Sequence, residues 1–309
     1  MTAQSVGGGQ VTTTRSPRRR KLPRWLIGYI FISPWLLAFV AFEAYPILSG
    51  FYHSFTDWTA TGRAERFVGL DNYVEAFTRD PLFWKAVSNT IYFIGVSVPL
   101  GIITAFALAM MLNSKISGTT LYRTIYYLPS VVPAVAAVIV WIFIFETRRG
   151  ILNFGLELIG LPAIRWLSDP SWAMPALIIM SLWSIGASMI IFLAGLQGIP
   201  QELYEAAEVD GSGGWHSLWR ITVPLMTPTI FFNLVMSLVA AFQAFNNAFI
   251  MTNGGPNNAT LLYMLHLYNN AFRYFRMGYA SALAVVLFII VFGLTLFVYR
   301  SSRRWVYYS

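Results

Sequence analysis

Six long apolar stretches, separated by short polar segments, most constrain how this chain can fold. They cover about residues 26–50, 86–112, 121–145, 173–196, 227–251 and 278–300. Each is near the roughly 20 residues that a helix needs to cross a bilayer. Their apolar residues run continuously instead of alternating with polar ones, which predicts helices and not β-barrel strands. We therefore expect an all-α integral membrane protein with six transmembrane helices.

The composition agrees with that class. Of 309 residues, 57% are hydrophobic and only 11% are charged, whereas soluble domains carry roughly 25% charged residues. The absence of cysteine excludes disulfides and Cys-ligated metal centres. His53, His216 and His266 are far apart in the sequence and indicate no metal cluster.

The basic residues indicate how the helices are oriented. Residues 1–24 carry six Lys and Arg and no acidic residue, so we expect a disordered cytoplasmic arm. A signal peptide is the alternative, but the apolar run that follows is too long and lacks a small-residue cleavage site. The tail, residues 301–309, is also purely basic. By the positive-inside rule both termini are expected in the cytoplasm, with residues 25–300 as the transmembrane domain. The net charge is +8, and the charged residues flank the apolar stretches. This arrangement favours a membrane over a nucleic acid as the partner.

A polar segment at residues 198–226 separates the fourth and fifth stretches and contains EAAEVDGSGGWHSLWRITVP. Pro200 suits the first turn of a helix, and acidic residues favour its N-terminal half. Gly211 can end that helix in a left-handed conformation. A second short helix is expected at about 215–221, ended by Pro224. By its physical properties alone, the segment is either a solvated connector or an elbow that docks a soluble partner.

The spacing of this segment matches a known pattern. Glu205-Ala206-Ala207 is followed after three residues by Gly211, and after nine more by Ile221, one residue and Val223-Pro224. The pattern resembles the EAA loop of permease subunits from binding-protein-dependent ABC importers. Only Val223 departs, where that family usually has Leu. The resemblance implies that the loop couples the chain to an ATPase through Glu205, Ala206, Ala207, Asp210, Gly211, Ile221 and Pro224.

The rest of the chain, over roughly residues 25–300, resembles the maltose, glycerol-3-phosphate and multiple-sugar branch of that family. The matching stretches are Tyr45-Pro46, residues 67–73 (FVGLDNY), Leu128-Pro129 and residues 251–256 (MTNGGP). The last stretch is typical of the first of two unlike permeases in a sugar system.

This resemblance implies a type I ABC importer permease fold in the cytoplasmic (inner) membrane. It also implies four kinds of partner: a second, unlike permease, two ATP-binding subunits, an extracytoplasmic solute-binding protein and a sugar substrate. The chain has no phosphate-binding loop of the G-x-x-x-x-G-K-[ST] type. We therefore expect it to have no catalytic residue and no cofactor, with ATP and Mg²⁺ bound on the partner ATPase subunits.

Polar residues inside apolar stretches indicate where a solute could pass, because such residues are costly in a membrane and usually face an interior or a water-filled path. Amides and hydroxyls suit sugar hydroxyls, and aromatic rings suit the apolar faces of sugars. The candidates are Asn233, Ser237, Gln243 and Asn246 in the fifth stretch and Trp183 in the fourth. Ser237 also matches a sugar-contacting position in the maltose-type pattern. The alternative is that these residues only form hydrogen bonds between helices.

The alternatives to a sugar permease are a permease for another solute, a stand-alone transporter and a membrane enzyme. A permease for another polar solute, such as glycerol-3-phosphate, is the nearest alternative. A stand-alone secondary transporter would predict interrupted helices at matching positions in two halves, or a charged relay within the membrane. The sequence shows neither, and it shows no cluster of catalytic side chains that would indicate a membrane enzyme.

Overall fold

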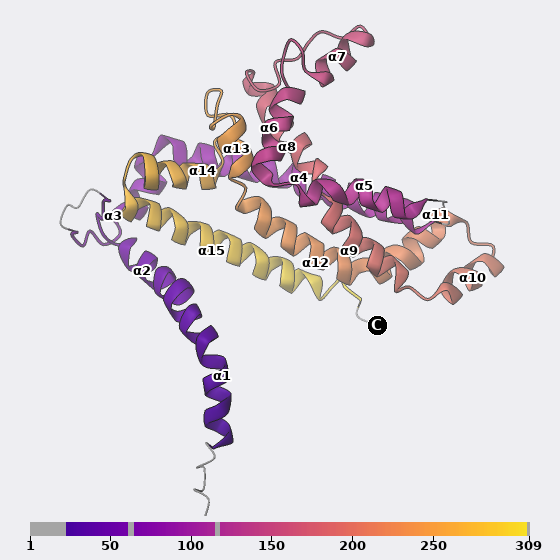
Figure 1. The fold of residues 1–309 in the computed structure, drawn as a ribbon, viewed down its shortest axis with the longest axis horizontal. Helices are drawn as coiled ribbons and strands as arrows, with labels where there is room; N and C mark the ends of the chain where they lie inside the picture. Colours follow the sequence, from indigo (N-terminus) through magenta and orange to yellow (C-terminus); the bar gives the residue numbers. More distant parts are fainter. Residues whose placement is uncertain (1–22, 61–64, 115–117, 308–309) are drawn as a thin grey trace, which may run out of the picture. The chain divides into compact units, whose positions relative to one another are not determined.

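The computed structural model describes residues 23–60, 65–114 and 118–307. The basic arm expected over residues 1–24 lies outside this part, apart from its last two residues. The chain divides into two compact units, residues 1–49 and 50–309, and each is described by itself. All regular elements in the described part are helices (Figure 1).

The first unit holds the first apolar stretch. It contains α1 (Arg24–Phe39), a π-helical turn η1 (Val40–Ala44) and the start of α2 (Tyr45–His53), which continues into the second unit. The Tyr45 N–H bonds the carbonyl of Val40 across the π turn. This turn directly precedes Pro46, whose ring blocks an ordinary helical hydrogen bond, so the chain stays helical by widening one turn.

The second unit is built around one long helix, α4 (Pro81–Asn113). The helices α8 (Pro170–Trp183), α9 (Gly186–Gln197) and α12 (Val223–Phe242) pack against it, and α15 (Met277–Ser302) packs against α12 (Figure 1). Shorter elements connect them: α3 (Asp71–Val74), η2 (Glu75–Arg79), α5 (Thr119–Val131), α6 (Ala134–Ile144), α7 (Ile151–Leu158), α10 (Gln201–Val209), α11 (Gly214–Ser217), η3 (Leu218–Thr222), α13 (Asn246–Met251), α14 (Tyr263–Tyr268) and η4 (Asn269–Arg273).

The structure has up to six membrane spans, as the apolar stretches predict, but several are broken. Four helical segments in the described residues are long and apolar enough to cross a bilayer, one of them (Gly214–Met251) with a short interruption, and two bent helix pairs could each supply one more. The pair α5 and α6 bends by 102° and the pair α8 and α9 by 47°. The sharper bend falls at Pro133, which lacks the N–H that would continue α5.

Two details of the predicted helices are wrong. The fifth stretch is not one helix through residue 251, because α12 ends at Phe242 and α13 begins at Asn246. Pro224 also does not end a short helix. Instead α11, η3 and α12 form one helical run, in which the Val223 N–H bonds the Leu218 carbonyl. A π-helical turn thus accommodates Pro224 within a helical run, as another π-helical turn accommodates Pro46.

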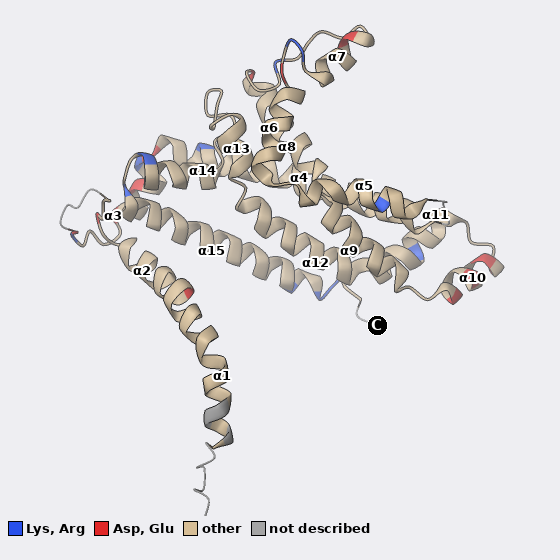
Figure 2. Ribbon diagram, viewed as in Figure 1, with Lys and Arg blue, Asp and Glu red and all other residues tan. Residues whose placement is uncertain are grey.

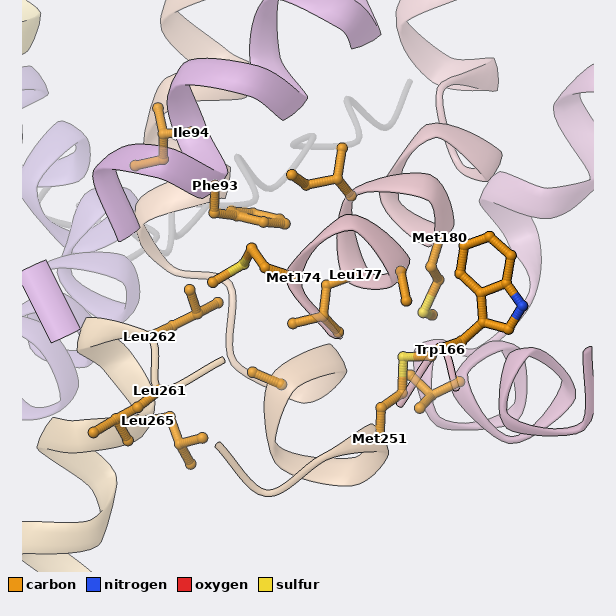
Figure 3. Close-up of a cluster of buried hydrophobic side chains, with 14 of the residues drawn as sticks. Phe93, Ile94, Trp166, Met174, Leu177, Met180, Met251, Leu261, Leu262 and Leu265 are labelled. Carbon is orange, nitrogen blue, oxygen red and sulfur yellow. The ribbon is translucent and has the colours of Figure 1, made fainter. Parts of the chain in front are cut away.

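The largest apolar core of the second unit lies where α4, α8, α13 and the loop before α14 meet. Phe93 of α4, Leu177 of α8, Met251 of α13 and Leu261 of the loop contribute to it, with Trp166 at one edge (Figure 3). Charged side chains of the same unit gather in its loops and near helix ends, and the middles of the long helices carry almost none (Figure 2).

Polar side chains join the starts of α4 and α15 to the last turn of α14, at the end of the unit away from α10. The Asp80 carboxylate accepts the Leu82 N–H at 2.8 Å and caps α4. It also accepts the Tyr279 hydroxyl of α15 at 2.6 Å and lies 2.8 Å from Nε2 of His266 in α14. Nearby, Arg276 pairs with Glu75 at 2.6 Å. This network fixes the framework in which α4 and α15 begin.

Candidate coupling loop and translocation cavity

The segment that resembles an EAA loop folds as the residues predict at its first helix. Helix α10 spans Gln201–Val209, with Pro200 immediately before it. Gly211 ends it with φ of +76°, a left-handed conformation that favours glycine. The Ser212 N–H bonds the Ala207 carbonyl at 2.8 Å and closes the turn.

One face of this loop is open. Glu205, Ala206, Asp210 and Gly211 are exposed, whereas Ala207, Ile221 and Pro224 are partly buried. Among the described residues the Glu205 carboxylate accepts only the Gln201 amide, at 2.9 Å, which leaves it able to accept from a further donor. Large apolar side chains stand beside it, because Val209 is 88% and Trp215 is 74% exposed. An acidic helix next to exposed apolar side chains forms a surface to which a soluble protein can bind.

The opposite face of α10 is tied to the membrane helices. The Tyr204 hydroxyl lies 2.9 Å from the Thr222 hydroxyl of η3. Around this contact is a hollow of about 370 Å³, lined by Tyr204, Ser212, Thr222 and Met110 of α4 among others. The sequence does not reveal this contact, because a Tyr and a Thr eighteen positions apart form no recognisable motif.

A second candidate site is an open cavity of about 380 Å³ between α4, α8, α9 and α12. It lies at the break between α12 and α13, where Ala244 and Phe245 are not helical. Ser237, Gln243 and Asn246, three of the predicted path residues, line it. Gln243 and Asn246 are exposed, so their amides are available to a solute.

The break between α8 and α9 opens onto the same cavity. Ser181 and Ser184 line it before the break, and Ser188 lines it after. Ser97 completes the lining from α4. The sequence analysis missed these serines, although the three- and four-residue spacing of Ser181, Ser184 and Ser188 would place them on one helix face.

None of the described residues that line this cavity is Asp, Glu, Lys, Arg or His. The polar groups there are hydroxyls and carboxamides, which both donate and accept hydrogen bonds. The cavity can therefore bind a solute with many hydroxyls and offers no fixed charge to an ionic one.

Two of the predicted path residues lie away from the cavity lining. Asn233 is buried, and its amide donates to the Thr229 carbonyl of its own helix at 3.0 Å. Trp183 packs against the large core, with its ring centroid 6.1 Å from that of Trp141. Asn247 also lines the cavity, across the helix break from Gln243.

Comparison with known proteins identifies the family. Residues 97–307 match the model of the binding-protein-dependent transport system inner membrane component. The chain belongs to this family. The resemblance carried by the EAA loop is thereby confirmed at the level of the family, and the relatives described below are named as transport permeases or transporters.

Several relatives are similar over nearly their whole length. The probable ABC transporter permease protein YesP of Bacillus subtilis is 41% identical, covering 98% of this chain and 97% of the relative. The lactose transport system permease protein LacF of Rhizobium radiobacter is 35% identical, covering 95% and 99%. A solved bacterial alginate ABC transporter, in complex with an alginate pentasaccharide-bound periplasmic protein, contains a chain 26% identical to this one. It covers 91% of this chain and 94% of its own, with a TM-score of 0.80.

Proposed function

We propose that this chain is a permease subunit of an ATP-driven importer and moves a carbohydrate across the cytoplasmic membrane by alternating access. Among its relatives are permeases named for lactose and for multiple sugars, and the similar solved transporter is involved in the import of the acidic polysaccharide alginate. The cavity between the broken helices is the solute path in this proposal.

The lining of the cavity carries the proposal. It is uncharged and rich in hydroxyls and amides, which favours a neutral oligosaccharide. The alternative is sn-glycerol-3-phosphate, the substrate named for a relative from Brucella abortus that is 35% identical to this chain. A phosphate dianion calls for Arg, Lys or a helix N-terminus at its site. The cavity lining offers no Arg or Lys, although the N-terminal ends of α9 and α13 reach it at Ile185 and Phe245.

The free energy for transport comes from ATP hydrolysis on other subunits. We propose that two ATP-binding subunits, which hold ATP and Mg²⁺, dock on the exposed face of α10. The Glu205 carboxylate meets a basic group there, and Gly211 serves the geometry of the turn. Movement of α10 reaches the membrane helices through Tyr204 and Thr222, and rigid-body motion then alternates the cavity between the two sides.

The assembly has further members. A second, unlike permease completes the path, and an extracytoplasmic binding protein delivers the solute. In this arrangement α10, the basic N-terminal arm and the tail face the cytoplasm.

Reconstitution tests the proposal. The complex of both permeases and the ATPase is placed in proteoliposomes with its binding protein, and uptake of neutral oligosaccharides and of glycerol-3-phosphate is measured with ATP hydrolysis. We expect neutral sugar uptake that stops in Glu205→Ala and persists in Glu202→Ala, a matched change on the same helix. Uptake by this chain without an ATPase would contradict the coupling, and uptake of glycerol-3-phosphate alone would contradict the sugar.

A further inference from the structure

A groove on the surface of the second unit lies apart from both sites described above. It runs between α12 and α15 and has a volume of about 360 Å³. Its lining is almost wholly apolar: Phe231, Phe232, Val235 and Met236 from α12, and Phe292, Thr295, Leu296 and Tyr299 from α15. The stretch from Phe292 to Tyr299 extends roughly 10 Å along the helix axis. The groove is therefore a slot that runs lengthwise between two membrane helices.

One end of the groove is aromatic and basic. The Arg303 guanidinium lies 6.0 Å from the centre of the Tyr299 ring. Trp305 lies 6.2 Å from Phe231, ring centre to ring centre. Arg300 and Arg304 are exposed beside Arg303, and no carboxylate within the described part of the chain forms an ion pair with any of the three.

The arginines are held in place and do not lie on a loose tail. The Val306 N–H bonds the Ser302 carbonyl at 2.8 Å, and the Tyr307 N–H bonds the Thr227 hydroxyl of α12 at 3.0 Å. These bonds fold the segment after α15 back onto α12. The backbone that carries the three arginines is thus fixed, and the Arg303 guanidinium lies beside Tyr299 at the end of the slot.

We propose that this groove binds one anionic phospholipid of the bilayer, with an acyl chain between α12 and α15 and the phosphate on the arginines. Aromatic rings with a polar edge suit the depth of lipid headgroups, and basic residues between membrane helices bind anionic headgroups. Arginine can hold a phosphate through two parallel hydrogen bonds. A helix-terminal arginine also interacts favourably with the helix dipole, but that explains neither the cluster of three nor the slot that ends beneath it.

Photo-crosslinking of the complete transporter tests this site. The purified complex is placed in nanodiscs that contain either photoactivatable phosphatidylglycerol or photoactivatable phosphatidylcholine at the same fraction, and the labelled peptides are mapped. We expect phosphatidylglycerol to label residues 231–236 and 292–299 preferentially. Changing Arg300, Arg303 and Arg304 together to Gln should reduce that preference by about tenfold or more, since each basic residue near an anionic surface contributes about 1 kcal/mol.

Four further variants make the result specific. The same arginines changed to Lys keep the charge and should keep most of the preference. Arg148, Arg149 and Arg165 changed to Gln remove three exposed charges from elsewhere on the chain and should leave labelling of the groove unchanged. Thr295→Phe fills the slot and should lower labelling by both lipids, whereas Thr295→Ser should not.

Two outcomes would overturn the proposal. The first is equal labelling by the two lipids in the wild-type complex. The second is a groove closed to lipid by another helix. Because the chain has no cysteine, Met236→Cys gives a single reactive site, and its rapid crosslinking to a protein segment instead of a lipid analogue would identify such a helix.

Discussion

Nε2 of His266 lies 2.8 Å from Oδ2 of Asp80, and both side chains are largely buried. The two residues are 186 positions apart, so the contact joins α14 to the start of α4. The same carboxylate holds Tyr279 of α15. One buried carboxylate thus fixes three helices that frame the bundle around the cavity.

Asp80→Asn should lower the stability of the assembled permease. An Asn can still cap α4, but it removes the negative charge that accepts from both Tyr279 and His266. Leaving buried partners poorly satisfied costs about 1–3 kcal/mol. Thermal unfolding of the purified complex measures the change, and Asp71→Asn is the control, because the ion pair of Asp71 with Arg79 is exposed and worth little.

The stability of this end of the molecule should fall on acidification. Burial lowers the pKa of His266 below its ordinary value of 6.5, and the Asp80 carboxylate only partly offsets that effect. Below pH 6.5 the unfolded chain therefore binds a proton more readily than the folded chain does, so protonation favours unfolding.

Asp80 acts in the same direction at lower pH. Burial raises its pKa, but hydrogen bonds from Tyr279, the Leu82 N–H and His266 outweigh burial and hold the pKa below its usual range. Its contribution to stability is lost as the pH falls through that lowered pKa. The unfolding midpoint of the wild type should drop between pH 7.5 and 5.5 by more than that of His266→Gln. Equal drops in the two proteins would show that the histidine does not control the response.

Gly278→Ala should destabilise the fold by about 1–3 kcal/mol through overpacking. Gly278 begins α15, its N–H donates to the Trp58 carbonyl at 2.8 Å, and a Cβ would collide with the Thr56 carbonyl. Gly293→Ala in the same helix is the matched control, since nothing lies within 4 Å of its added Cβ. The control should be neutral or slightly stabilising, because Ala favours a helix more than Gly does. Equal unfolding midpoints for the two variants would contradict the close contact.

Ser237→Ala should weaken solute transport without changing stability. Ser237 lines the cavity, and loss of one hydrogen bond to a solute costs about 0.5–1.5 kcal/mol, roughly a threefold to tenfold rise in the half-saturating concentration. Asn233→Ala should lower stability without weakening solute transport, because that side chain is buried and its amide donates to a carbonyl of its own helix. Uptake kinetics and unfolding measured on the same preparations separate the two effects.

The sequence predicts the apolar stretches, the α10 helix and its glycine end, because each rests on local physics: hydrophobic length, capping and a left-handed turn. It does not predict the break at Ala244 and Phe245. Polar residues flank the break at Gln243, Asn246 and Asn247, but no proline or glycine marks the interruption. Tertiary packing around α13 decides it. Of the path residues selected from the sequence, Ser237, Gln243 and Asn246 line the cavity, whereas Asn233 does not; their role in solute passage stays a prediction.

Tyr204→Phe should uncouple transport from ATP hydrolysis while leaving the docking surface intact. It removes only the hydroxyl that lies 2.9 Å from Thr222, and the exposed face with Glu205 is untouched. Under the proposed mechanism α10 then still moves with the ATPase, but less of this movement is transmitted to the membrane helices. The sugar transported per ATP should fall, and co-purification of the ATPase should not. Thr222→Val removes the other half of the contact. If the bond carries the coupling, the double variant should be no worse than either single variant, because residues that act through one interaction are not additive. Fully additive losses would mean that each side chain acts through other contacts.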